Sequence, residues 1–178
     1  MIFGNPDKFA FLIEKVPEWC ANGFVNGLLY IYVNGEMFPK KLYTTTLSDV
    51  WSLFDYAFTN PPKDERLYAL PDDELFAELR RLRFPEYFTD DEDEDEDYRY
   101  DIEYDYRYDI EYYEIGDWGY NIFAVSGGEN VRILIGHWEN SDNFELVNSS
   151  EISLEEFTRL RDEFSEYYHK EIQGEQHG

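Results

Sequence analysis

Cysteine is almost absent from this chain of 178 residues. Cys20 is the only one, so no intramolecular disulfide can form and no cysteine cluster can hold a metal ion. A reducing cytoplasm suits such a sequence. Cys20 also lacks the basic neighbours that would activate a thiol, so we interpret it as a small buried hydrophobic residue.

Long apolar runs and basic residues are scarce as well. No stretch approaches the ~18 apolar residues of a membrane-spanning helix, and the N-terminus does not have the pattern of a signal peptide. Fifteen Lys and Arg residues stand against 40 Asp and Glu, which gives a net charge of −25. This charge repels nucleic acid and anionic membranes, so we expect the protein to bind neither. The single cysteine and the missing signal-peptide pattern predict a cytoplasmic protein.

Patterns that carry catalysis are missing. The three histidines, His137, His169 and His177, do not have the spacing of metal ligands. Gly127-Gly128 is too short for a phosphate-binding loop. The acidic residues lack the glycine and the spaced ligands of a calcium loop. We therefore expect no enzyme, no cofactor and no metal site, with an unrecognised carboxylate enzyme as a distant alternative.

Aromatic residues, in contrast, are abundant. The chain has 16 Tyr, 14 Phe and 4 Trp, or 19% of its residues. Disordered acidic chains contain few aromatic residues, whereas protein cores and interfaces use many. The length is right for one domain with a sizeable core. A folded single domain is the expected state.

Several segments have clear secondary-structure signals. The apolar run 8–14 predicts a buried strand. Asn34-Gly35 predicts a type I′ hairpin between strands 27–33 and 36–39. Apolar spacing predicts one helix over 50–58 and a second that follows Leu70, has Pro71 in its first turn and ends near Arg83.

The last third continues the pattern. A turn at 116–119 leads to strands expected over 121–125, 131–138 and 144–147. Ser153 and Glu156 form a capping box that starts a helix reaching Ile172. The predicted fold class is α+β, a single domain over 1–173 with a mostly antiparallel sheet, two central helices and a C-terminal helix. The tail 174–178 is expected to fray.

An acidic, tyrosine-rich insert over 90–114 interrupts this pattern. It begins with eight consecutive acids, and Tyr98–Asp105 is then repeated almost unchanged as Tyr106–Tyr113. With fourteen acids and two arginines, the insert carries about half of the net charge. Strict alternation predicts a strand over 98–112 with tyrosines on one face and charges on the other. Such a strand would exceed the ~40 Å diameter of a domain of this size, so it should bend or project.

Two interpretations of the insert are open. Its tyrosines could pack on the core beneath a solvated charged face, or the insert could be a docking surface for a basic protein, since tyrosines anchor interfaces and carboxylates pair with Lys and Arg. The candidate partner-binding residues are Asp90, Asp91, Glu92, Asp93, Glu94, Asp95, Glu96, Asp97, Tyr100, Asp101, Glu103, Tyr104, Asp105, Tyr108, Asp109 and Glu111.

Two parts of the chain carry motifs of a known family. The motifs are Met1–Pro6, Lys8–Ala10, Asn26–Leu28, Val33–Gly35 and Phe38–Pro39, and later Phe123–Val125 and Glu129–Ile133. In these residues the chain resembles the Immunity protein 42 family of bacterial polymorphic toxin systems. These motifs are structural and carry no catalytic residue across. The insert over 90–114 is not part of the shared pattern.

The resemblance implies an antidote that binds and neutralises a cognate toxin, including toxins of contact-dependent growth inhibition. Nuclease toxins have basic clefts for phosphates, so an acidic antidote could occlude such an active site. The expected partner is therefore a basic toxin domain of the nuclease kind. An acidic nucleic-acid mimic that inhibits a DNA- or RNA-binding protein is the alternative.

Overall fold

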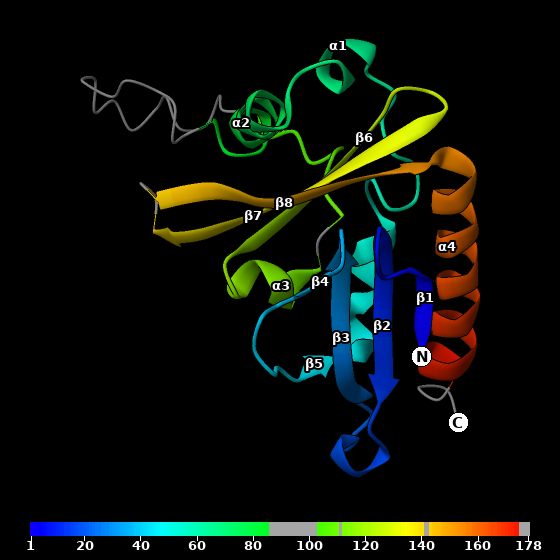
Figure 1. Cartoon of the computed structure of the whole chain (residues 1–178). Coiled ribbons are helices and arrows are strands. Elements are labelled where there is room, and N and C mark those ends of the chain that lie inside the picture. Colours follow the sequence, from blue (N-terminus) through cyan, green and yellow to red (C-terminus); the bar gives the residue numbers. More distant parts are fainter. Residues whose placement is uncertain (86–102, 111, 141–142, 175–178) are drawn as a thin grey trace.

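The computed structural model describes residues 1–85, 103–110, 112–140 and 143–174. Its strands form a five-stranded and a three-stranded antiparallel sheet (Figure 1). The first contains β1 (Ile2–Asn5), β2 (Phe9–Lys15), β3 (Asn26–Val33), β4 (Glu36–Phe38) and β5 (Thr45–Thr46). The second contains β6 (Tyr120–Ser126), β7 (Asn130–Asn140) and β8 (Asn143–Ser153).

The helices cover both sheets. They are α1 (Glu65–Tyr68), α2 (Asp72–Arg83), α3 (Tyr113–Asp117) and α4 (Leu154–Tyr167), with 3-10 helices at Pro17–Trp19 and Leu47–Phe54 and a π-helical turn at Tyr168–Ile172. Helix α4 runs alongside β1, while α1 and α2 lie on the three-stranded sheet (Figure 1). The predicted α+β fold with a C-terminal helix is confirmed, and its strands divide between two sheets.

The N-terminal hairpin follows the predicted turn chemistry. Asn34 and Gly35 have φ angles of +49° and +82°, the left-handed values that a type I′ turn requires. The turn pairs β3 with β4, so the predicted hairpin is confirmed. Strand β1, which pairs with β2, was not predicted because only four residues form it.

Strand β6 of the three-stranded sheet is buried on both faces. Along β6, Ile122 and Ala124 belong to the larger hydrophobic cluster, which also contacts α4. The alternate residues Phe123 and Val125 belong to a second cluster beneath α1 and α2. Gly136 on β7 leaves space for the Phe76 ring, which would lie only 2.0 Å from an added Cβ. The sheet therefore separates two apolar cores.

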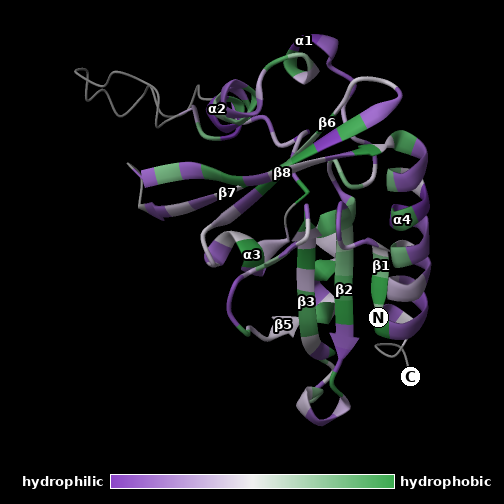
Figure 2. Cartoon of the chain, viewed as in Figure 1, coloured by the Kyte–Doolittle hydropathy of each residue, from purple (hydrophilic) through white to green (hydrophobic). Residues whose placement is uncertain are grey.

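Helix α4 forms where its sequence predicts. The Ser153 hydroxyl accepts from the Glu156 backbone N–H, and the Glu156 carboxylate accepts from the Ser153 N–H, each at 3.1 Å. Figure 2 shows apolar residues filling β2 and β3 and alternating with polar ones along α4. The buried residues on and just after α4 are Phe157, Leu160, Phe164, Tyr168 and Ile172. The capping box and the helical spacing are both confirmed.

Other predicted elements differ from those observed. The helix predicted over 50–58 is a 3-10 helix that ends at Phe54, although Ala57 and Phe58 are buried as expected. Strand β8 continues to Ser153, well beyond the predicted 144–147. Its polar residues Asn148 and Ser149 are hydrogen-bonded to Val33 and Asp72, so they do not end the strand.

The strand predicted over 98–112 is wrong for the part that the structure describes. Residues 103–106 have no regular secondary structure, and a turn follows at Arg107 and Tyr108. After the turn, Asp109 forms an isolated antiparallel bridge with Phe123, and no strand is formed at 110 or 112. The rest of the predicted strand lies outside the described residues. Helix α3 then begins at Tyr113, earlier than the predicted turn at 116–119.

Candidate protein-binding surface

We call residues 103–110 and 112 the described tyrosine-rich segment. Its second half, which contains Tyr108, Ile110 and Tyr112, belongs to the core. Its backbone bonds to β6, since Ala124 N–H donates to the Tyr108 carbonyl at 2.8 Å and Ile110 N–H donates to the Ile122 carbonyl at 3.0 Å. Tyr108, Ile110 and Tyr112 are 4%, 1% and 1% exposed. Tyr108 packs in the cluster beneath α2, and the other two pack in the larger cluster. This half joins the two cores, as the structural interpretation of the tyrosines expected.

Tyr112 is also fixed by its hydroxyl. The O–H donates to the Leu29 carbonyl at 2.9 Å, so the polar end of a fully buried side chain is satisfied. Burial raises the pKa of Tyr112 well above its ordinary value. The ring therefore ties the segment to β3 of the five-stranded sheet and has a structural role.

Asp109 is buried rather than displayed. Its carboxylate accepts from Arg83 Nε at 2.7 Å, and the two side chains are 3% and 16% exposed. The Asp109 carbonyl also accepts from the Ala57 N–H at 2.8 Å. Asp109 therefore anchors the segment to α2, and neither it nor Tyr108 is on the surface that a partner reaches in this conformation.

The first half of the described segment faces solvent. Tyr104 and Tyr106 are 40% and 37% exposed. Tyr56, which follows the 3-10 helix Leu47–Phe54, lies beside them and is 40% exposed. The Tyr106 ring stacks on Tyr56 with centroids 5.7 Å apart and contacts Tyr104 at 6.3 Å. The Arg83 guanidinium lies 4.1 Å from the Tyr106 centroid. Because Arg83 is held by Asp109, it connects the exposed rings to the buried ion pair.

Carboxylates flank these rings. Glu103 is exposed and forms no ion pair with any other residue that the structure describes. Asp105 is bonded by Arg107, whose Nε and terminal nitrogen donate to it at 2.9 and 2.6 Å. These hydrogen bonds lower the pKa of Asp105. We call the group formed by Tyr56, Tyr104, Tyr106 and Glu103 the tyrosine surface.

The C-terminal end of α2 continues this aromatic and arginine-rich region. The Arg80 guanidinium lies 4.0 Å from the Phe144 centroid on β8, and Arg83 lies 4.4 Å from the Phe84 centroid. Asp105 N–H donates to the Leu82 carbonyl at 2.9 Å. The end of α2 and the start of the described segment are therefore held together beside the tyrosine surface.

The remaining candidate residues lie outside the described part of the chain. They are the eight acids Asp90–Asp97 together with Tyr100, Asp101 and Glu111. Their role in partner binding stays a prediction. The run is connected in sequence to Pro85 on one side and Glu103 on the other, so both of its described flanks lie at the end of α2.

Sequence reasoning missed three residues of this region. Tyr106 lies on the predicted tyrosine face, but Tyr108 was selected in its place. Tyr56 lies between Phe54 and Ala57 but off the predicted buried face. An aromatic residue in such a position indicates an exposed ring, and this was the signal that could have identified it. Arg83 gave no signal, because its partner Asp109 is 26 residues away in sequence.

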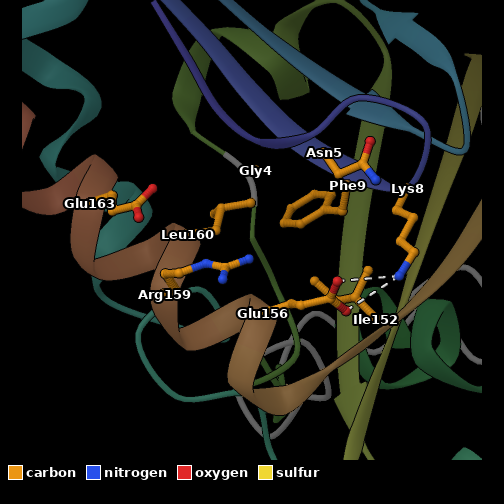
Figure 3. A pocket seen from close by; sticks show the side chains of 9 residues that line it. All are labelled: Gly4, Asn5, Lys8, Phe9, Ile152, Glu156, Arg159, Leu160 and Glu163. Carbon is orange, nitrogen blue, oxygen red and sulfur yellow. Dashed lines mark hydrogen bonds and ion pairs between the residues drawn. The ribbon is translucent and has the colours of Figure 1, made fainter.

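A polar hollow lies elsewhere, between α4 and the turn after β1. Its volume is about 430 Å³, and Asn5, Lys8, Glu156, Arg159 and Glu163 supply its polar lining. Figure 3 shows Lys8 reaching across to Glu156, with their charged atoms 3.2 Å apart. Glu156 also completes the helix cap, and the Ser153 N–H that it accepts lowers its pKa. The hollow therefore joins structural groups and displays no catalytic arrangement.

Within the described ranges, no group of three or more His, Cys, Asp or Glu residues is arranged to hold a metal ion. No helix in the same part of the chain is long and apolar enough to cross a membrane.

Comparison with known proteins decides the family. The model of the family described as Immunity protein 42 matches residues 1–168. The chain belongs to this family. As a member of the Immunity protein 42 family, it acts as an immunity protein, an inhibitor of a cognate toxin and not an enzyme.

A solved structure supports the fold of this Immunity protein 42 member. The chain is similar to the crystal structure of CdiI from Burkholderia dolosa AUO158, with a TM-score of 0.69 and 24% sequence identity. The similarity covers 93% of this chain and 99% of CdiI. Among proteins with a curated description, none matches this chain.

Proposed function

We propose that this immunity protein works in the cytoplasm and neutralises a basic nuclease toxin by covering its active site. Contact is made by the tyrosine surface, and the acid run Asp90–Asp97 attracts the toxin. Family membership supports the toxin as partner. The net charge of −25 supports a partner of opposite charge.

The observation that carries the proposal is the tyrosine surface itself. Three exposed rings contact one another, and Arg83 restrains the central one. Rings held in this way lose little conformational freedom on binding, and tyrosines are frequent interface anchors. Glu103 supplies a carboxylate that has no partner among the described residues. Such a surface suits a protein rich in Lys and Arg.

A nuclease is the proposed target because of the positive charge in its cleft. The cleft of a nuclease presents cations to the phosphates of its substrate. Carboxylates form charge-assisted hydrogen bonds with the same cations. An acidic protein placed over the cleft would therefore compete with the substrate. A general nucleic-acid mimic would use the same chemistry but would not require a cognate partner.

The test is inhibition of the toxin domain encoded beside this protein. Cleavage of a labelled oligonucleotide should stop at a one-to-one ratio of protein to toxin. The variant Glu103→Gln/Tyr104→Ala should bind the toxin ~30-fold more weakly or worse, as expected for loss of interface anchors worth ~2 kcal/mol or more. Its urea unfolding curve should match that of the parent.

Tyr113→Ala is the matched control. Tyr113 is 76% exposed on α3 and lies outside the tyrosine surface, so its loss should leave inhibition unchanged. If Glu103→Gln/Tyr104→Ala inhibits as well as the parent, the tyrosine surface is not the interface. An unrelated basic nuclease should remain active, since inhibition of both enzymes would favour the nucleic-acid mimic. Slower complex formation with excess uncleavable oligonucleotide would support occlusion of the active site.

A further inference from the structure

We infer that the tyrosine surface selects arginine rather than lysine side chains of the bound toxin. The inference rests on the proposed function, because it assigns a chemistry to the partner of the same surface. It follows from how the protein binds its own arginines around this surface and elsewhere.

Three of the five arginines that form an ion pair between described residues share one mode of contact, in which each has a carboxylate and an aromatic ring. Arg83 is bonded to Asp109 and lies over Tyr106. Arg107 is bonded to Asp105 and lies 5.7 Å from the Tyr108 centroid. The third, on β7, is Arg132, which has Asp72 and Tyr68 as its partners. Arg81 and Arg161 pair with a carboxylate, and neither lies over a ring in the described part of the chain.

The protein's own lysines lie over an aromatic ring less often. Lys8, Lys63 and Lys170 each pair with a carboxylate, and none of the three lies over a ring in the described part of the chain. Lys40 is the exception, with Glu36 and Phe38 as partners. A planar guanidinium stacks on a ring and bonds a carboxylate through a rigid fork, whereas an ammonium is a compact, strongly hydrated charge. A combination of ring and carboxylate therefore favours arginine.

The tyrosine surface has this combination to offer. Tyr56 and Tyr104 are both 40% exposed, and no cation from the described ranges lies over either ring. Each ring follows an exposed acid in the sequence, Asp55 and Glu103 respectively. Neither acid forms an ion pair with another described residue. The two exposed rings are therefore free of cations from the described residues, and each has, on the neighbouring residue of the chain, a carboxylate that is unpaired among those residues, a combination that can receive arginines from outside the chain.

The experiment uses hexa-arginine and hexa-lysine as probes of the full-length protein. Calorimetry gives the Kd of each peptide, and the measured quantity is the ratio of the hexa-lysine Kd to the hexa-arginine Kd. Both peptides carry the same charge, so general attraction to the acid run largely cancels in the ratio. Cation–π contact at an exposed site contributes about two- to fivefold for each ring. The ratio for the parent should exceed one.

Variants separate the rings from the carboxylates. Arginine also bonds carboxylates in a bidentate manner, which gives a preference that does not depend on tyrosine. Because lysine also makes cation–π contacts, the ratio carries only the difference between the two cations, and Tyr56→Leu/Tyr104→Leu should reduce it by about twofold or more without removing all binding. The matched control Tyr113→Leu should keep the parental ratio. A parental ratio of one, or an equal ratio in the double variant, overturns the inference.

The two hypotheses fail in different ways. If the toxin is inhibited through Glu103 and Tyr104 but the peptide ratio is one, the proposed function stands and the arginine selectivity is wrong. If the toxin is not inhibited at all, the proposed function fails whatever the peptides show. A ratio above one that is equal in the parent and the Tyr56→Leu/Tyr104→Leu variant would assign the preference to the carboxylates alone.

Discussion

The described tyrosine-rich segment has two halves with different environments, and the boundary between them follows Tyr106, inside the second repeat. Tyr104 and Tyr112 occupy equivalent positions of the two repeats. Tyr104 and Tyr106 are exposed, whereas Tyr108 and Tyr112 are buried. The difference begins where the backbone of Tyr108 and Ile110 bonds to β6. Residues beside a paired strand contribute to the core, and residues before it remain available to a partner. A repeated motif therefore does not imply a repeated role.

The largest expected effect contrasts a buried and an exposed tyrosine. Tyr112→Ala should lower the free energy of unfolding by ~3–5 kcal/mol, because it removes a fully buried ring and its hydrogen bond to Leu29. Tyr104→Ala should change it by less than ~0.5 kcal/mol, as is usual for surface sites. Urea unfolding followed by tryptophan fluorescence measures both. Equal losses would mean that the two halves do not differ in structural role.

A second contrast concerns carboxylates. Asp109→Asn should lower the free energy of unfolding by ~3 kcal/mol, since it removes the negative charge from a largely buried ion pair with Arg83. Glu103→Gln should leave it unchanged, because Glu103 is exposed. For equal amounts of folded protein, Glu103→Gln should weaken toxin binding more than Asp109→Asn does. Parental stability of Asp109→Asn would contradict the structural role of this ion pair.

The acid run tests the difference between attraction and contact. Replacing all eight acids of Asp90–Asp97 by Asn and Gln should slow association with the toxin by ~10-fold at low salt. Dissociation should change little, because exposed charges steer encounter more than they hold a complex. The difference between variant and parent should shrink as salt screens the charges. Stopped-flow kinetics at two ionic strengths provides the measurement, and equal association rates at low salt would show that the run only confers solubility.

The smallest expected effect lies at the boundary between the halves. Hydrogen bonds from Arg107 lower the pKa of Asp105. A carboxyl whose pKa is lower in the folded than in the unfolded state adds stability above its unfolded pKa, and this stability is lost as pH falls through its folded value. Asp105→Asn should therefore lower the Tm slightly at pH 6, and this difference from the parent should shrink as pH falls below the ordinary pKa of Asp. A Tm difference that does not change with pH would point to a packing effect instead.

Much of the fold could be predicted from local signals. Asn34-Gly35 and the Ser153–Glu156 capping box each determine their element through nearby residues, and both predictions are confirmed. The strand predicted over 98–112 fails in its described part because alternation does not state which residues find a paired neighbour. Burial of Tyr108, Ile110 and Tyr112 follows the alternation, although the backbone turns at Arg107 and Tyr108.

The candidate site was harder to predict. Its acidic and tyrosine content is visible in the sequence, but its geometry depends on contacts between distant segments. Tyr56 reaches Tyr106 across fifty positions, and Arg83 reaches Asp109. No periodic pattern connects such residues. The choice between Tyr106 and Tyr108 as the exposed ring therefore required the tertiary structure.

The hydrogen bond between Asp105 N–H and the Leu82 carbonyl has a consequence for how the family can diversify. It fastens the chain that follows residues 86–102 to the last turn of α2, from which those residues depart. The entropic cost of closing a loop rises only slowly with its length. Residues between these fixed ends can thus be lengthened, shortened or exchanged at little cost to the domain. If the acid run attracts the toxin as proposed, the attraction to a different toxin could be adjusted by exchanging residues 86–102 while both cores stay as they are.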